Sequence, residues 1–173
     1  MTKASQKDLL IFRFENSDGR GCFTANAVDK ATTKAYPEAE DGEYRNPYRH
    51  PGPFRDVILR KKILKKPYTI NDKYINWSYG FHKLDMVRQW FDDAPILEAL
   101  FDYTALVIFK PRNSRTLRTG KYQCVFDKSQ SVIEGVITSY ENFLIYEKTA
   151  VLEGIDSYKN VFNVQTVPAP DQL

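Results

Sequence analysis

Apolar and polar side chains alternate near the start of the chain. In residues 9–15, three apolar side chains share one face of an extended chain, namely Leu10, Phe12 and Phe14. Arg13 and Glu15 share the opposite face. The alternation predicts a strand with one buried face, and the polar residues 16–19, which end in glycine, predict a turn after it.

Other apolar segments predict further strands. Residues 103–109 are apolar almost throughout, which is typical of a strand buried on both faces. Residues 122–126 alternate again, with Gln123 on the face opposite its neighbours. Residues 132–138 and 142–146 are expected to form strands as well.

Helical spacing of apolar residues appears in two adjacent segments. Residues 84–91 and 97–101 each place apolar side chains on one side of a helix, and Asp93 is expected to cap the second helix. The basic segment 56–66 fits a third, short helix. Residues 29–55 contain several prolines and are expected to be irregular.

Together these elements predict the α+β fold class. We expect one domain over residues 1–173, built from a twisted mixed β-sheet and two or three short helices. The segments 1–8 and 167–173 are expected to be disordered tails.

Composition narrows the class of protein. The chain has 173 residues, of which 42% are hydrophobic and 14% aromatic, so it carries enough apolar surface for a core. Its apolar runs are too short to cross a bilayer and no targeting segment is visible, so we expect a cytoplasmic protein without a membrane partner. A net charge of +3 does not by itself imply a nucleic-acid partner.

The cysteines and histidines do not predict a metal site or a disulfide framework. Cys22 and Cys124 stand in apolar surroundings and are expected to be buried thiols. Only His50 and His82 could join them, and the four residues lack the spacing of a zinc site. We expect no metal and no resident cofactor.

Short motifs recur in a fixed order along the chain. They are Phe12-Arg13-Phe14-Glu15, Gly19-Arg20-Gly21, Pro51-Gly52-Pro53 with Asp56, Gly80-Phe81 with Trp90-Phe91, and Gly120-Lys121-Tyr122-Gln123. In this order, over roughly residues 10–127, the chain resembles a family of small uncharacterised bacteriophage proteins. That family usually has a serine where this chain has Lys83.

The phage resemblance implies an accessory protein and favours an interaction protein over an enzyme. Such a protein would act in the cytoplasm of the infected bacterium. It would bind and modulate a host or viral macromolecule, and a host or phage protein is the partner we expect first.

The layout also resembles a degenerate ADP-ribosyltransferase. This resemblance implies that Arg13 holds a dinucleotide phosphate, Tyr79 stacks on a ring and Gln123 orients the acceptor, with NAD as the ligand. A glutamine cannot serve as the usual carboxylate, so the resemblance favours binding over turnover. The competing interpretation places Arg13 and Glu15 in an exposed ion pair and Gln123 on a strand surface.

Basic residues form two clusters in the sequence. One belongs to the predicted short helix and contains Arg60, Lys61, Lys62, Lys65 and Lys66; the other contains Arg112, Arg115 and Arg118. Joined on one surface, they would form a footprint for nucleic acid or for an acidic protein. Nearby aromatic residues, including Tyr74 and Trp77, would then stack on bases; otherwise they are packing residues and the clusters are solvated faces.

Overall fold

The structure is a computed structural model that describes residues 9–37, 55–66 and 69–153. The helices in this part of the chain are α1 (Ala27–Ala35), α2 (Val57–Ile63), α3 (Leu84–Trp90), α4 (Ala94–Leu100) and α5 (Tyr140–Glu153). The strands are β1 (Ile11–Glu15), β2 (Leu64–Lys66), β3 (Thr69–Ile70), β4 (Ser78–Gly80), β5 (Ala105–Pro111), β6 (Leu117–Thr119), β7 (Cys124–Phe126) and β8 (Ser131–Ile137). Three short 3₁₀ turns are η2 (Asp72–Tyr74), η3 (Ser114–Thr116) and η4 (Lys128–Gln130).

The strands pair in three small antiparallel sheets. The first sheet has the order β1-β5-β8, the second sheet has the order β4-β7-β6, and β2 pairs with β3. The predicted α+β class is confirmed. The details differ from the expectation, since the described strands form several antiparallel sheets instead of one mixed sheet, and five helices accompany them.

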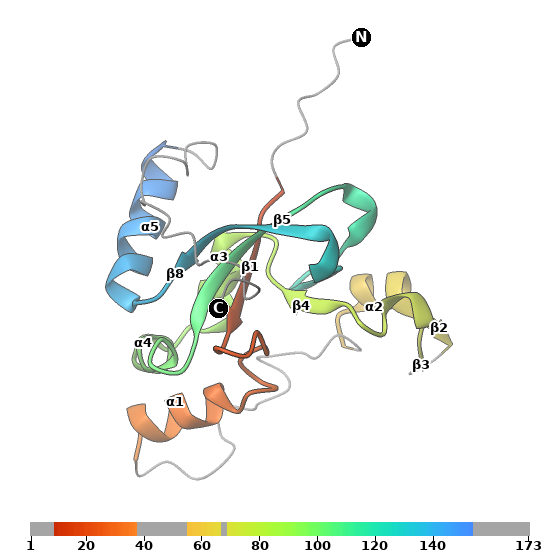
Figure 1. The fold of residues 1–173 in the computed structure, drawn as a ribbon. Helices are drawn as coiled ribbons and strands as arrows, with labels where there is room; N and C mark the ends of the chain where they lie inside the picture. Colours follow the sequence, from red (N-terminus) through yellow and green to blue (C-terminus); the bar gives the residue numbers. More distant parts are fainter. Residues whose placement is uncertain (1–8, 38–54, 67–68, 154–173) are drawn as a thin grey trace, which may run out of the picture.

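The elements stack in layers around the first sheet. Phe12 and Phe14 of β1 face a core that α1, α3, α4 and α5 complete. Ile11 faces the other way, into a second core with Phe109 of β5 and Phe126 of β7. In Figure 1, α1, α4 and α5 accordingly lie to one side of β1 and β5, and α2 lies to the other. Strand alternation along β1 thus supplies two cores from one strand.

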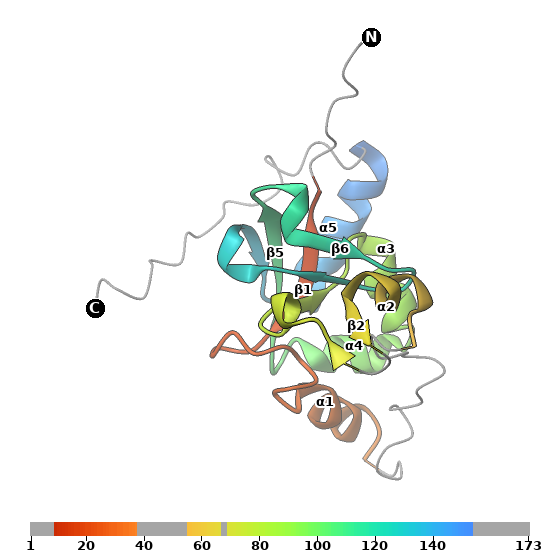
Figure 2. The same cartoon turned by 90° about the vertical axis from the view of Figure 1, so that its right-hand side faces the viewer.

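Helix α2 covers the outer face of the second sheet. Leu59 and Ile63 of α2 are buried against Val125 of β7, and aromatic side chains pack around them. Figure 2 shows α2 beside β6, where the second sheet crosses in front of β1. The order of layers is therefore helices, first sheet, second sheet and α2.

The two sheets meet at β1 and β4. Phe12 and Phe81 exchange two backbone hydrogen bonds of 2.8 Å, so the chain beyond β4 pairs with the edge of β1. Gly80 makes this approach possible, because a Cβ there would lie 2.8 Å from Ile11 Cγ2 and 3.1 Å from the Phe12 carbonyl oxygen. The glycine of the Gly-Phe motif is thus explained by packing.

Several expected elements are confirmed. Strands β1, β5, β7 and β8 lie where the apolar patterns predict them, and α3 and α4 occupy the two helical segments. Asp93 caps α4, since its side chain accepts a hydrogen bond from the Ile96 N–H. The basic segment forms α2, but the helix ends at Ile63 and β2 follows.

Other elements differ from the prediction. Residues 142–146 belong to α5 instead of a strand, and the burial of Phe143 and Tyr146, three residues apart, fits helical spacing. Helix α1 was not predicted, because its buried residues are mostly small and produce no apolar run. Strand β6 lies in the segment of the second basic cluster, for which the apolar pattern predicted no strand. The predicted tails, His50 and the Pro-Gly-Pro loop lie outside the described residues, and the extent of the domain over residues 1–173 stays a prediction.

The close approach of β4 to β1 yields a stability prediction. Gly80→Ala should lower the free energy of unfolding by about 1–3 kcal/mol, because the added methyl group overlaps Ile11 and the β1 backbone. Gly135→Ala is the matched control, since its Cβ would meet only Ile108 Cδ1 at an ordinary 3.6 Å. Urea unfolding of both variants measures the difference, and equal stabilities would contradict the proposed approach of the strands.

Candidate functional site

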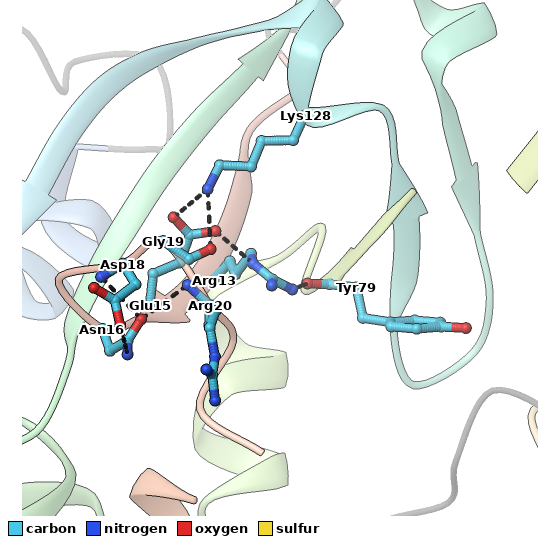
Figure 3. Close-up of polar contacts among 8 residues, drawn as sticks. All are labelled: Arg13, Glu15, Asn16, Asp18, Gly19, Arg20, Tyr79 and Lys128. Carbon is cyan, nitrogen blue, oxygen red and sulfur yellow. Dashed lines mark hydrogen bonds and ion pairs between the residues drawn. The ribbon is translucent and has the colours of Figure 1, made fainter. Parts of the chain in front are cut away.

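A charged cluster lies between the first and second sheets. Glu15 has a side chain only 6% exposed and accepts hydrogen bonds from two cations. Arg13 Nε lies 2.6 Å from Oε1, and Lys128 Nζ lies 2.7 Å from Oε2. Figure 3 shows these side chains converging on the carboxylate. One interpretation of the sequence expected an exposed ion pair between Arg13 and Glu15. The pair forms, but Glu15 is buried and Arg13 is only 14% exposed.

The remaining hydrogen bonds of the cluster are made to backbone carbonyls. Arg13 Nη1 donates to the Tyr79 carbonyl oxygen of β4, and Lys128 Nζ donates to the Gly19 carbonyl oxygen at 3.2 Å. Both cations are therefore held by groups of the protein itself. This arrangement satisfies the polar atoms that burial removes from water.

The glycines of the Gly19-Arg20-Gly21 motif leave room for the two cations. Gly19 has a positive φ of 69°, and a Cβ there would lie 2.9 Å from Lys128 Nζ. A Cβ on Gly21 would lie 2.8 Å from Arg13 Nη2. The motif is therefore explained by a turn that closes over the charged cluster.

Arg13, Tyr79 and Gln123 were predicted to bind a nucleotide together. The side chain of Tyr79 does not lie beside the Arg13 guanidinium. Figure 3 shows the Arg13 guanidinium meeting the backbone of Tyr79, while the phenol ring points away. That ring packs with Leu59 and Val125 on the outer side of the second sheet, and burial raises the pKa of the Tyr79 hydroxyl. Gln123 is buried directly before β7. Nucleotide binding by Arg13, Tyr79 and Gln123 stays a prediction that these contacts do not favour.

A buried aspartate fixes α2 to the second sheet. Asp56 Oδ1 accepts hydrogen bonds from the N–H groups of Ile58 and Leu59 at 3.1 and 3.0 Å, which caps α2. Its Oδ2 accepts a hydrogen bond from the Tyr122 N–H at 2.9 Å. Gly120 is required beside it, because a Cβ there would overlap the carboxylate and lie 2.7 Å from Leu59 Cβ. Two motifs far apart in the sequence thus meet in one contact.

The Asp56 clamp and a hydrogen bond from Lys62 hold α2 beside the segment that contains Arg118 of the second basic cluster. Lys62 Nζ of α2 donates a 2.6 Å hydrogen bond to the Thr119 carbonyl oxygen of β6. We call the resulting surface the basic face and define it by Arg60, Lys61, Lys62 and Lys65 together with Arg118 and Lys121. Arg60, Lys61, Lys62, Lys65 and Lys121 are exposed.

The other predicted basic residues lie around this surface. The Arg115 carbonyl oxygen accepts a 3.1 Å hydrogen bond from Arg118 Nη1, so Arg115 borders the basic face. Arg112 lies instead beside η4, where its N–H donates to the Gln130 carbonyl oxygen at 3.0 Å. The Lys66 side chain lies outside the described part of the structure.

Aromatic rings lie among the cations. The Arg118 guanidinium lies 5.6 Å from the ring centre of Tyr74 and 5.8 Å from that of Trp77. The two rings are in edge contact at 4.8 Å between centres. Lys121 Nζ lies 4.8 Å from the ring centre of Tyr122. Cation–π attraction accounts for these positions.

The described residues contain no other obvious site for chemistry. No group of three His, Cys, Asp or Glu side chains suited to a metal ion occurs among them. Cys22 and Cys124 are buried free thiols, as predicted, and burial raises the pKa of Cys22 to about 12, which disfavours the reactive thiolate. None of the described helices combines the length and apolar character needed to span a membrane.

Lys128 and the double role of Asp56 were missing from the sequence interpretation. Lys128 lies 113 residues after Glu15, and no local pattern marks it as a partner. Asp56 stood out as a motif residue, but its contact with Tyr122 depends on tertiary packing.

The Asp56 clamp yields a prediction of acid sensitivity. Burial raises the pKa of Asp56, but hydrogen bonds from the backbone of Tyr122, Leu59, Lys121 and Ile58 outweigh this and hold the pKa below its ordinary value of 3.8. The ionised carboxylate therefore stabilises the fold above about pH 4, and this contribution is lost as the pH falls through the lowered pKa. Asp56→Asn should lower the free energy of unfolding at pH 7 by about 1–3 kcal/mol, because its amide NH₂ faces the Tyr122 N–H.

Asp93→Asn is the matched control for this prediction. Asparagine also caps helices, and the Tyr36 hydroxyl that now donates to Asp93 can rotate to a new partner, so this change should be nearly neutral. Denaturant titrations at pH 7 and pH 3 make the comparison. Equal losses in both variants, or an unchanged acid sensitivity in Asp56→Asn, would contradict the clamp.

Comparison with known proteins identifies the family. A search of curated proteins found no match, and neither did a search of solved structures. The model of the Bacteriophage T4 Y00F protein family matches residues 4–139, a span that includes the charged cluster, the clamp and the basic face. The resemblance to ADP-ribosyltransferases finds no support in these comparisons. The chain therefore belongs to the Bacteriophage T4 Y00F protein family, in agreement with its resemblance to uncharacterised phage proteins.

Proposed function

We propose that this phage protein is an accessory factor that acts in the infected bacterium by binding a host or viral macromolecule through its basic face. The observation that carries the proposal is that the Asp56 clamp and the Lys62–Thr119 hydrogen bond hold the basic helix α2 beside the segment that contains Arg118 and Lys121. Binding alone is proposed, and catalysis has no part in it.

The distribution of charge supports the position of this surface. Residues 55–66 contain six basic residues and one acid, Asp56, which is buried. Residues 110–122 contain five basic residues and no acid, whereas residues 84–102, which include α3 and α4, contain five acids and one base. In the described part of the chain, basic and acidic residues are thus concentrated in different segments. Such a field orients an anionic partner toward α2 and β6 and away from α3 and α4.

Rigidity of the surface supports the same proposal. The basic residues of α2 are attached to a helix that is capped, buried on its inner side and hydrogen-bonded to β6. Side chains on such an element lose less entropy on binding than side chains on a free loop. Exposed pairs such as Lys65–Asp72, at 3.9 Å, hold little energy and would yield to a partner.

Affinity purification from infected cells tests the proposal. Three baits are compared: the wild-type chain, a Lys61→Gln/Lys65→Gln variant, and a control variant with Lys30→Gln on α1 and Lys148→Gln on α5. The control removes the same charge from exposed lysines on the opposite side of the molecule, as Figures 1 and 2 show for these helices. Thermal unfolding confirms that all three baits are folded.

We expect the wild-type and control baits to recover the same partner, and the Lys61→Gln/Lys65→Gln bait to recover at least about fivefold less of it. Two lost charge contacts at about 0.5 kcal/mol each give this factor. Identical recovery with all three baits would show that binding occurs elsewhere. Recovery of no macromolecule above background with the wild-type bait would overturn the proposed function itself.

A further inference from the structure

The basic face contains a compact aromatic group. Tyr74 and Trp77 meet edge to face, and Arg118 lies over both rings. The group stands on the hydrophobic contact between α2 and β7, since Tyr74 and Trp77 pack against Leu59, Ile63 and Val125. Both rings remain partly exposed, and Lys73 lies 5.7 Å from the Tyr74 ring centre. This is a supported ring surface with cations at its edge.

A third aromatic ring lies on the hairpin between β6 and β7. Tyr122 is 39% exposed, and its ring contacts Lys121. Its backbone N–H is held by Asp56, so the position of the residue is fixed by the same clamp that holds α2. Arg118, Lys121 and Tyr122 therefore present cations and a ring within one turn of the chain. Lys62 reaches the same hairpin through the Thr119 carbonyl oxygen.

We propose that the basic face binds single-stranded nucleic acid, an inference that rests on the proposed function and names its partner class. Lysine and arginine side chains contact the phosphates, while bases stack on Tyr122 and on the Arg118–Tyr74–Trp77 group. Single strands are bound in this way because every base offers a flat face, and the guanidinium of arginine stacks on bases as well.

The alternative partners need only part of this arrangement. An acidic protein or a duplex is attracted by the charges alone, and a duplex keeps its base faces covered by stacking. A single strand uses both features, since its phosphates contact the cations and its bases stack on the rings that lie among them. The interleaving of rings and cations is thus the observation that favours a single strand.

The chain has a natural reporter for stacking at this surface. Its two tryptophans lie in different places, with Trp77 on the basic face and Trp90 buried in the helical core at 7% exposure. A base that stacks on the Arg118–Tyr74–Trp77 group lies close to the indole of Trp77 and quenches its fluorescence. Contacts made only by charge leave the fluorescence unchanged.

The experiment titrates the full chain with four probes at several salt concentrations. The probes are a 15-nucleotide oligothymidylate, a 15-nucleotide oligouridylate, a 15-base-pair DNA duplex and heparin. We expect both single strands to bind with quenching, and their relative affinities distinguish DNA from RNA. The logarithm of the binding constant should fall with the logarithm of salt concentration by about 0.7 for each phosphate neutralised.

Two arginine-to-lysine variants separate stacking from charge. Arg118→Lys keeps the charge but loses the planar guanidinium, so affinity for the single strands should fall about tenfold with loss of quenching, and heparin binding should be unchanged. Arg20→Lys is the matched control, because Arg20 is exposed on the turn after β1 and should leave all titrations unchanged.

The outcomes distinguish this inference from the proposed function. Binding of heparin or duplex at least as tightly as the single strands, without quenching, would overturn the single-strand inference and leave an anionic partner in place. Equal effects of Arg118→Lys and Arg20→Lys on single-strand binding would overturn it as well. If none of the four probes binds but a protein partner is recovered from infected cells, the nucleic-acid inference is refuted and the proposed function stands.

Discussion

The buried carboxylate of Glu15 is the contact on which the arrangement of the sheets depends. It lies between Arg13 and Lys128, and each cation extends its remaining hydrogen bond to a backbone carbonyl of a neighbouring segment. A buried charge is costly unless it is paired and hydrogen-bonded, so these groups must converge whenever β1 packs under the second sheet. The cluster thereby ties β1 to β4, to the Gly19 turn and to η4. The same contacts occupy the Arg13 guanidinium.

The basic face follows from this interior arrangement. With the inner side of the second sheet fixed against β1, its outer side is available to α2, and Asp56 joins that helix to the hairpin of β6 and β7. The basic helix α2 then lies beside the β6–β7 hairpin, where Arg118 contacts Tyr74 and Trp77 and Lys121 contacts Tyr122. The net charge of +3 is small, but the fold places several of the basic residues near one another. The motifs found in this sequence contain the acids and glycines of these contacts, namely Glu15, Gly19, Gly21, Asp56, Gly80 and Gly120.

Sequence patterns predicted an element correctly where its own apolar residues or its capping residue determine its structure. The alternation in β1, the apolar run of β5 and the Asp93 cap of α4 predicted their structures correctly. Periodicity failed where tertiary contacts determine the structure. In α1 the small residues Ala27 and Ala31 are buried in the core to which α4 also contributes. The apolar run of residues 142–146 fits a strand or a helix equally, and it forms part of α5. Arg13 and Glu15 were correctly placed on one face, but the burial of that face required the second sheet, which local patterns do not reveal. The two basic clusters were found from the sequence, and the proximity of α2 to Arg118 depends on hydrogen bonds that Asp56 accepts and Lys62 donates.

The free energy of unfolding of Glu15→Gln tests most directly whether the charged cluster holds the sheets together. The amide keeps the shape of the side chain but leaves Arg13 and Lys128 facing each other without a counter-charge, so we expect a loss of about 3 kcal/mol. Asp102→Asn is the control, because it makes the same chemical change in the exposed Lys34–Asp102 pair and should cost less than about 1 kcal/mol. Equal, small losses in the two variants would contradict the account, since Glu15 would then be dispensable and Arg13 free to bind a phosphate.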